Sequence, residues 1–124
     1  MVVVPLILYT DDTSGNKTKK WNKFDVYCLL LAGLPKKSNT ELHNIHFITC
    51  SNNLSAIDMA QPIVDDLLEL ENGVEMFDAM LGTDVIVIAP LICFLCDNPR
   101  ASEICSHLGS SAHKFCRICE VDYN

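Results

Sequence analysis

Two apolar runs in this chain of 124 residues each end in aspartate, and this repeated pattern constrains the possible folds more than any other feature. Residues 2–9 are followed by Asp11 and Asp12, and residues 91–96 are followed directly by Asp97. Because short aliphatic and β-branched runs are typical of buried strands, the sequence predicts two strands that carry carboxylates at their ends. This layout is typical of sites at which divalent metal ions assist phosphoryl transfer.

The composition limits the chain to one core and gives it a negative charge. With 49% hydrophobic residues, the chain can bury one core, but it is too short for two ordinary domains. Nine Lys and Arg against sixteen Asp and Glu give a formal charge of −7, which repels nucleic acid unless positive charge is concentrated locally. Such a concentration surrounds Trp21, in Lys17, Lys19, Lys20 and Lys23. This cluster is a candidate for contacts with DNA phosphates and a stacked base, although a charged loop is more often only solvated.

The apolar segments are too short to cross a membrane. The longest, residues 85–96, falls below the roughly 20 residues that a membrane-spanning helix needs, and it contains Pro90, so we expect it to form buried sheet. The N-terminus lacks the basic residues and the cleavage site of a secretory signal. The seven cysteines are an odd number and mostly lie in apolar runs, which argues against a disulfide framework. We therefore expect a reducing, intracellular location without membrane contact.

The apolar periodicity predicts three consecutive strands before the first helix. Residues 2–9 form the first strand, with an irregular start at Pro5, and residues 11–23 form a polar loop. Residues 24–32 and 43–50 follow as the second and third strands, which suggests a meander.

An amphipathic helix is predicted after these strands. Ser55 and Asp58 have the spacing of a capping box, and Gly73 is the expected stop. Pro62 either kinks this helix or is its true first residue. Residues 74–79 and 84–88 form either a further strand pair or one strand with an irregular lead-in, and a short helix is expected at 101–108.

Several segments of the chain together resemble the catalytic core of transposases of the CACTA (En/Spm) class. The resemblance covers nearly the whole chain, from about Leu6 to Cys119. It rests on residues 8–16, 20–25, 31–35 and 64–70, on Cys96-Asp97-Asn98-Pro99-Arg100-Ala101 and on Cys116-Arg117-Ile118-Cys119.

The resemblance implies a fold and a division of the chain. The implied fold is α/β, a partial ribonuclease-H-like core in which helices flank a mixed sheet, ending in a Cys-x-x-Cys knuckle. Residues 1–109 would be the N-terminal part of this core, and residues 110–124 the start of a zinc-knuckle insertion. The order of three strands, a helix and a strand that carries a terminal acid agrees with this fold, but the pattern alone leaves several α/β folds open.

The resemblance also implies catalytic residues. Asp11 matches the first catalytic aspartate, with Asp12 where glycine is commoner in the family. Asp97 matches the second, in an Asp-x-Pro-Ala-like segment with Arg100 inserted before Ala101. The third catalytic acid of the family lies farther downstream than the end of this chain, so we expect a fragment that has little or no activity alone.

Two kinds of metal ion follow from the same resemblance. Asp11, Asp12 and Asp97 are the expected ligands of Mg²⁺ or Mn²⁺, which prefer hard oxygen donors. Cys116 and Cys119 are the expected half of a Zn²⁺ site, whose remaining ligand, usually a histidine, comes later in the family. Two free thiols are the alternative for this pair. His107 and His113 are near enough to be considered as ligands, although a nearby histidine is more often a surface or capping residue.

The expected function is that of an enzyme fragment. It would belong to a nuclear cut-and-paste DNA transposase that cleaves and joins strands at transposon ends by metal-dependent phosphoryl transfer. The alternative is a decayed or domesticated remnant without catalysis, which acts as a protein-binding or DNA-binding module.

Overall fold

The computed structural model describes residues 1–14, 23–119 and 121, and it has an α/β architecture built on a mixed sheet. The sheet has four strands in the order β4-β3-β2-β7. Strand β2 pairs antiparallel with β3, β3 pairs antiparallel with β4, and β2 pairs parallel with β7. The bounds are β2 (Leu6–Ser14), β3 (Lys23–Leu31), β4 (Ile45–Ser51) and β7 (Leu91–Leu95).

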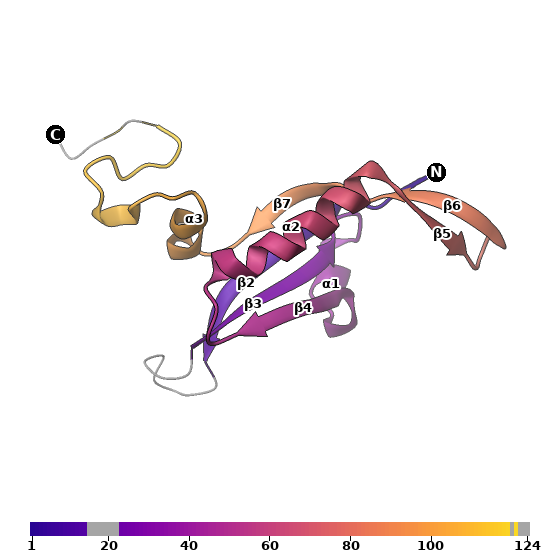
Figure 1. The fold of residues 1–124 in the computed structure, drawn as a ribbon, viewed down its shortest axis with the longest axis horizontal. Helices are drawn as coiled ribbons and strands as arrows, with labels where there is room; N and C mark the ends of the chain where they lie inside the picture. The colour runs from indigo at the N-terminus through magenta and orange to yellow at the C-terminus, as the bar shows by residue number, and fades with distance from the viewer. Residues whose placement is uncertain (15–22, 120, 122–124) are drawn as a thin grey trace.

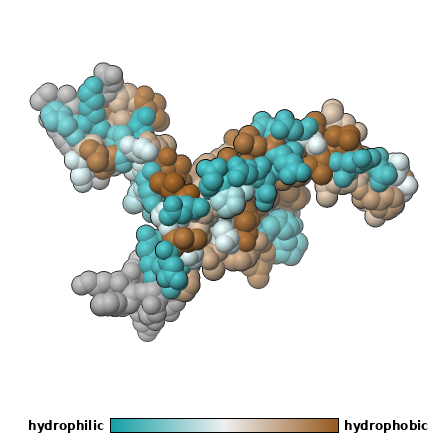
Figure 2. Space-filling view, in the orientation of Figure 1, coloured by the Kyte–Doolittle hydropathy of each residue, from teal (hydrophilic) through white to brown (hydrophobic). Residues whose placement is uncertain are grey.

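One long helix covers one face of this sheet (Figure 1). Helix α2 (Ala56–Asn72) begins at a capping box, in which the Ser55 side chain accepts from the Asp58 backbone N–H, and it ends at Gly73 with φ of 100°. The helix packs Met59 and Ile63 onto the sheet, while Figure 2 shows hydrophilic side chains on its outer side. The buried core consists of Leu6, Leu8, Tyr27, Ala56, Met59, Ile63, Leu67 and Ala89.

A second, smaller sheet extends from one end of the first (Figure 1). Its order is β1-β6-β5, formed by β1 (Val2–Val3), β5 (Val74–Asp78) and β6 (Thr83–Ile88). Strand β1 pairs parallel with β6, and β5 and β6 form an antiparallel hairpin. The hairpin carries apolar side chains that remain exposed, such as Phe77 at 67% and Met80 at 98%.

Short helices complete the described part of the chain. They are α1 (Lys36–Asn39), η1 (Leu42–Asn44), α3 (Asn98–Ile104) and η2 (Gly109–Ser111). Helix α3 follows β7 directly, and it lies with the C-terminal segment at the end of the molecule opposite the β5–β6 hairpin (Figure 1). No helix in residues 1–14, 23–119 and 121 is long and apolar enough to span a membrane.

Most of the predicted elements are confirmed, including the three-stranded meander and the capped helix. Pro62 lies inside α2, so it is not the first residue of that helix. The expected short helix begins earlier and ends earlier than predicted, as α3.

Two expectations about the apolar runs were wrong. Strand β2 continues through Ser14, because its polar end pairs with the start of β3, so Asp11 and Asp12 lie in the strand and not in a loop. The stretch 85–96 was expected to be buried, and it contains most of β6 and all of β7, strands of different sheets that are separated at Ala89 and Pro90. The side chains of β7 are exposed and not buried, since β7 is an edge strand of the four-stranded sheet.

Candidate functional site

The predicted carboxylates lie at the same level of two parallel strands, where β7 ends beside β2. Tyr9 pairs with Leu95 in the last register pair of β2 and β7. Asp11 and Asp97 each follow that pair by two residues, Asp11 still within β2 and Asp97 beyond the end of β7. The parallel pairing of β2 with β7 is therefore what brings together two acids that lie 86 residues apart in the sequence (97 − 11).

Asp97 serves as the N-cap of α3. Its Oδ1 accepts a hydrogen bond of 2.9 Å from the backbone N–H of Arg100, and a proline stands in the first turn, where its missing N–H costs nothing. Its Oδ2 accepts no hydrogen bond from the described residues. The cap fixes the carboxylate while leaving one oxygen able to bind a cation.

Asp11 is held by its neighbours on the strand. The Tyr9 hydroxyl donates to Asp11 Oδ2 at 3.0 Å, and the Asp12 backbone N–H donates to Asp11 Oδ1 at 2.8 Å. Burial raises the pKa of Tyr9, and the hydrogen bond to Asp11 and the charges of Asp11 and Asp97 raise it further. The hydroxyl consequently stays protonated next to both carboxylates.

A small hollow of about 70 Å³ places Asp12 next to Asp97. Its lining also includes Lys23, Pro99, Arg100 and Glu103. Lys23 Nζ lies 3.1 Å from Asp12 Oδ2, so Asp12 already has a cationic partner. Asp12 thus shares the hollow with Asp97, while Asp11 does not line it and contacts Tyr9 instead.

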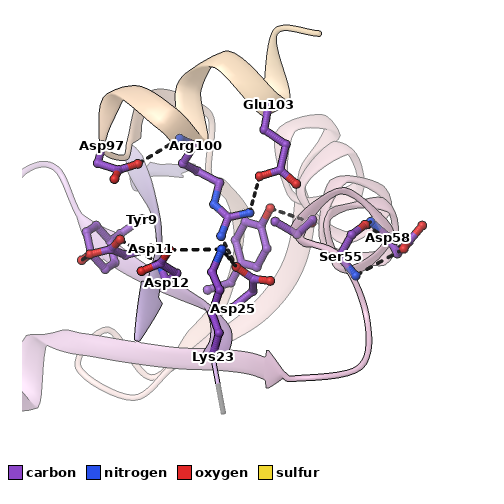
Figure 3. A network of polar contacts seen from close by, with 12 residues as sticks. Tyr9, Asp11, Asp12, Lys23, Asp25, Ser55, Asp58, Asp97, Arg100 and Glu103 are labelled. Atoms are coloured by element: carbon purple, nitrogen blue, oxygen red, sulfur yellow. Dashed lines mark hydrogen bonds and ion pairs between the residues drawn. The ribbon is translucent and has the colours of Figure 1, made fainter. Parts of the chain in front are cut away.

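Arg100 ties α3 to the sheet beneath this hollow. The guanidinium is 4% exposed, pairs with Asp25 of β3 and donates from Nη1 to Glu103 Oε2 at 2.7 Å. Figure 3 shows Arg100 between these two acids, with Asp97 and Asp11 on the opposite side from Glu103. Burial lowers the pKa of Arg100, but the hydrogen bond and charge of Asp25 outweigh this, and the pKa is raised. The guanidinium is therefore always charged.

The charges of this region favour a cation. Two bases face five acids, which leaves a formal excess of three negative charges (5 − 2 = 3). The bases are Lys23 and Arg100, and the acids are Asp11, Asp12, Asp25, Asp97 and Glu103.

The donor set fits Mg²⁺ or Mn²⁺ in part. Mg²⁺ is usually bound through one or two carboxylates, with waters and substrate phosphates as the remaining ligands. Asp11 and Asp97 could supply those carboxylates. Asp12 could supply a further one if its ion pair with Lys23 opened. Residues 1–14, 23–119 and 121 contain no group of three or more His, Cys, Asp or Glu side chains arranged to hold a metal ion. A complete site needs a further ligand.

The Cys-x-x-Cys segment forms a tight turn around one sulfur. The backbone N–H groups of Ile118 and Cys119 both lie 3.4 Å from Cys116 Sγ. A hydrogen bond from the Cys119 side chain and these two N–H groups lower the pKa of Cys116. The segment therefore favours a thiolate, which is the form that binds Zn²⁺.

The two nearby histidines differ in their availability as ligands. His107 uses both ring nitrogens, because Nδ1 accepts from the Gly109 N–H at 2.9 Å and Nε2 donates to the Lys114 carbonyl at 3.0 Å. His107 thus acts as a turn-stabilising residue. His113 is exposed.

The predicted DNA-contact cluster falls mostly outside the described residues. The members outside the described residues are Lys17, Lys19, Lys20 and Trp21. Lys23 is described, and its ammonium pairs with Asp12 and lies 3.9 Å from Asp25.

Four residues of the site were not predicted from the sequence. A local signal existed for Tyr9, which precedes Asp11 by two positions and so shares its face of the strand. Asp25, Arg100 and Glu103 had none, since the Arg100–Asp25 contact spans 75 residues.

Comparisons with protein-family models, with curated proteins and with solved structures found no match to this chain.

Proposed function

We propose that this chain is the front part of the nuclease core of a cut-and-paste DNA transposase. It would contribute two carboxylates, Asp11 and Asp97, to a metal-dependent site that cleaves and joins DNA strands. The observation that carries the proposal is the position of these acids at the same level of parallel β2 and β7, beside the end of β7, with Asp97 Oδ2 free of hydrogen bonds from the described residues.

The strand order supports a ribonuclease-H-like core. Three antiparallel strands, a helix across one face and a further strand parallel to the first are the elements expected of that core. The resemblance to CACTA transposases implies acids after the first and the last of these strands; Asp97 follows the last strand, and Asp11 lies within the first, at the level where β7 ends. No other pair of carboxylates in the described residues has this relation to the sheet.

The chemistry explains the need for these groups. A divalent ion held by Asp11 and Asp97 would supply activation of the attacking oxygen and stabilisation of the leaving oxygen in displacement at phosphorus. Asp11 and Asp97 would position the ion, and Arg100 would hold the capped end of α3, and with it Asp97, against the sheet. A third acid and the partner ligands of Cys116 and Cys119 would come from outside the described residues.

A specific observation favours a second candidate, a remnant that binds without catalysis. Lys23 and Arg100 already form ion pairs with Asp12, Asp25 and Glu103, so part of the negative charge is compensated internally. A domain whose acids are paired in this way needs no metal ion to be stable.

Strand cleavage distinguishes the two candidates. In the longest polypeptide that the native transcript encodes, Asp97→Asn should abolish Mn²⁺-dependent nicking of DNA while circular dichroism remains unchanged, because asparagine keeps the capping oxygen. Asp66→Asn, an exposed change on α2, is the matched control. Nicking that survives in Asp97→Asn would sink the enzyme proposal. Zinc content of about one ion per chain, lost in Cys116→Ser, would test the knuckle separately.

A further inference from the structure

A hollow lies between α3 and the Cys-x-x-Cys turn, beside the carboxylates and separate from them. Its volume is about 590 Å³, which falls in the range of roughly 300 to 1,000 Å³ found for small-ligand sites. Pro99 and Ser102 line one wall, and Phe115, Arg117 and Ile118 line the other. We call this hollow the α3 cleft.

Arg117 is fixed in place at this cleft. Its Nη1 donates to the Asn98 carbonyl at 3.0 Å and to Ser102 Oγ at 2.7 Å, and its Nη2 donates to Asn98 Oδ1 at 2.9 Å. A guanidinium has five N–H groups, so two of them, on Nε and Nη2, have no partner among the described residues. A preordered pair of this kind matches the two oxygens of a phosphate or a carboxylate.

The charge of the segment also favours an anion. Residues 104–119 include Lys114 and Arg117 but no Asp or Glu, although the whole chain has a formal charge of −7. None of the described residues that line the α3 cleft is acidic. A phosphate would therefore meet attraction in the cleft and repulsion over most of the remaining surface.

The apolar part of the lining fits a base. Ile118 is 97% exposed and Leu108 is 85% exposed, and both border the cleft next to the Phe115 ring. Base stacking on an aromatic side chain is sequence-tolerant and favourable. An acidic peptide would use the arginine but would gain little from this apolar wall.

The position of the cleft links it to the carboxylates. Pro99 lines both the α3 cleft and the small hollow that contains Asp97. The two hollows therefore adjoin each other at Pro99.

We propose that the α3 cleft binds one nucleotide of single-stranded DNA, with the free edge of Arg117 on a backbone phosphate and the base against Phe115 and Ile118. This inference rests on the proposed function, because the bound nucleotide would belong to the DNA strand that is cut at Asp97.

The test is binding of fluorescein-labelled single-stranded oligothymidylate to the 124-residue chain, measured by anisotropy at low salt without Mg²⁺ or Mn²⁺. Arg117→Gln should weaken binding about tenfold, as expected for loss of a charged hydrogen-bonded contact. Lys114→Gln is the matched control, because it removes the same charge from the same segment but does not line the cleft, and it should change binding by less than about twofold.

A second variant covers the case in which Arg117→Gln disturbs the packing of α3. Ile118→Glu should weaken binding to a similar extent without a change in melting temperature, since the Ile118 side chain lies in solvent. Wild-type affinity in Ile118→Glu, or equal losses in Lys114→Gln and Arg117→Gln, would overturn the proposal. Tighter binding of a polyglutamate peptide than of the oligonucleotide, lost in Arg117→Gln, would overturn the nucleotide as the occupant.

The same chain separates this inference from the proposed function. Mn²⁺ affinity measured without DNA reports only on the carboxylates. If Asp97→Asn leaves Mn²⁺ affinity unchanged while Arg117→Gln and Ile118→Glu lose the oligonucleotide, the proposed catalysis fails and the α3 cleft stands as a DNA-binding site.

Discussion

Arg100→Leu is the substitution that tests most sharply how α3 is attached to the sheet. The guanidinium is 4% exposed and its partner Asp25 is 15% exposed, so leucine would leave a largely buried carboxylate without its main counter-charge. Removing one partner of a buried ion pair costs about 3 to 5 kcal/mol. Lys23 Nζ remains 3.9 Å from Asp25 and would compensate in part, so we expect the lower end, about 3 kcal/mol.

This loss corresponds to a measurable shift in melting temperature. An unfolding entropy of about 2.1 cal/mol/K per residue gives about 0.26 kcal/mol/K for 124 residues. A loss of about 3 kcal/mol therefore lowers the melting temperature by about 11 °C in differential scanning calorimetry.

Two further variants make the reasoning refutable. Glu103→Gln removes the more exposed partner of Arg100, at 40% exposure, and should cost less than about 1 kcal/mol. The double variant Arg100→Leu with Asp25→Asn removes the stranded charge and should recover most of the lost stability. A shift below about 4 °C for Arg100→Leu, or no recovery in the double variant, would refute the idea that this pair anchors α3.

Three other predictions concern the core and the knuckle. Tyr27→Phe should cost about 1 to 2 kcal/mol in urea unfolding, because the fully buried hydroxyl donates to the Ala56 carbonyl at 2.8 Å; an unchanged midpoint would contradict this. Ile63→Ala should lower the free energy of unfolding by about 2 to 5 kcal/mol. Its neighbour Val64 is 42% exposed, so Val64→Ala should cost less than about 1 kcal/mol. Equal losses in the two variants would show that α2 does not pack as described. Iodoacetamide should alkylate Cys116 at neutral pH faster than the exposed Cys105. Hydrogen bonds from the Cys119 side chain and from two backbone N–H groups lower the pKa of Cys116 and raise its thiolate fraction. Equal alkylation rates in peptide mapping would argue against the turn geometry.

The parts of the fold that were predictable are those set by local interactions. Helix α2 begins after Ser55 and ends at Gly73 because the capping box and a left-handed glycine act on adjacent backbone groups. The strands of the meander were likewise predictable, because apolar periodicity is a property of neighbouring positions in the sequence. The continuation of β2 to Ser14 was not predictable in this way, since its polar residues are extended only because they pair with β3.

The candidate site likewise contains residues that local sequence predicts and contacts that it does not predict. Asp11, Asp12 and Asp97 were predictable because each lies within three residues of the end of an apolar run. The Lys23 contact with Asp12 and the Arg100 contact with Asp25 depend on which strands become neighbours, which periodicity does not determine. The exposure of β7 also depends on sheet order, because the same apolar run would be buried in a central strand.

Mn²⁺ binding by the chain tests the central claim most directly. Free Mn²⁺ is measured by electron paramagnetic resonance during titration of the wild type, Asp97→Asn and the surface control Asp66→Asn. We expect weak binding by the wild type, equal binding by Asp66→Asn and about tenfold weaker binding by Asp97→Asn, because a carboxylate ligand becomes a neutral amide. Equal Mn²⁺ affinity in all three proteins would contradict a metal site at the ends of β2 and β7.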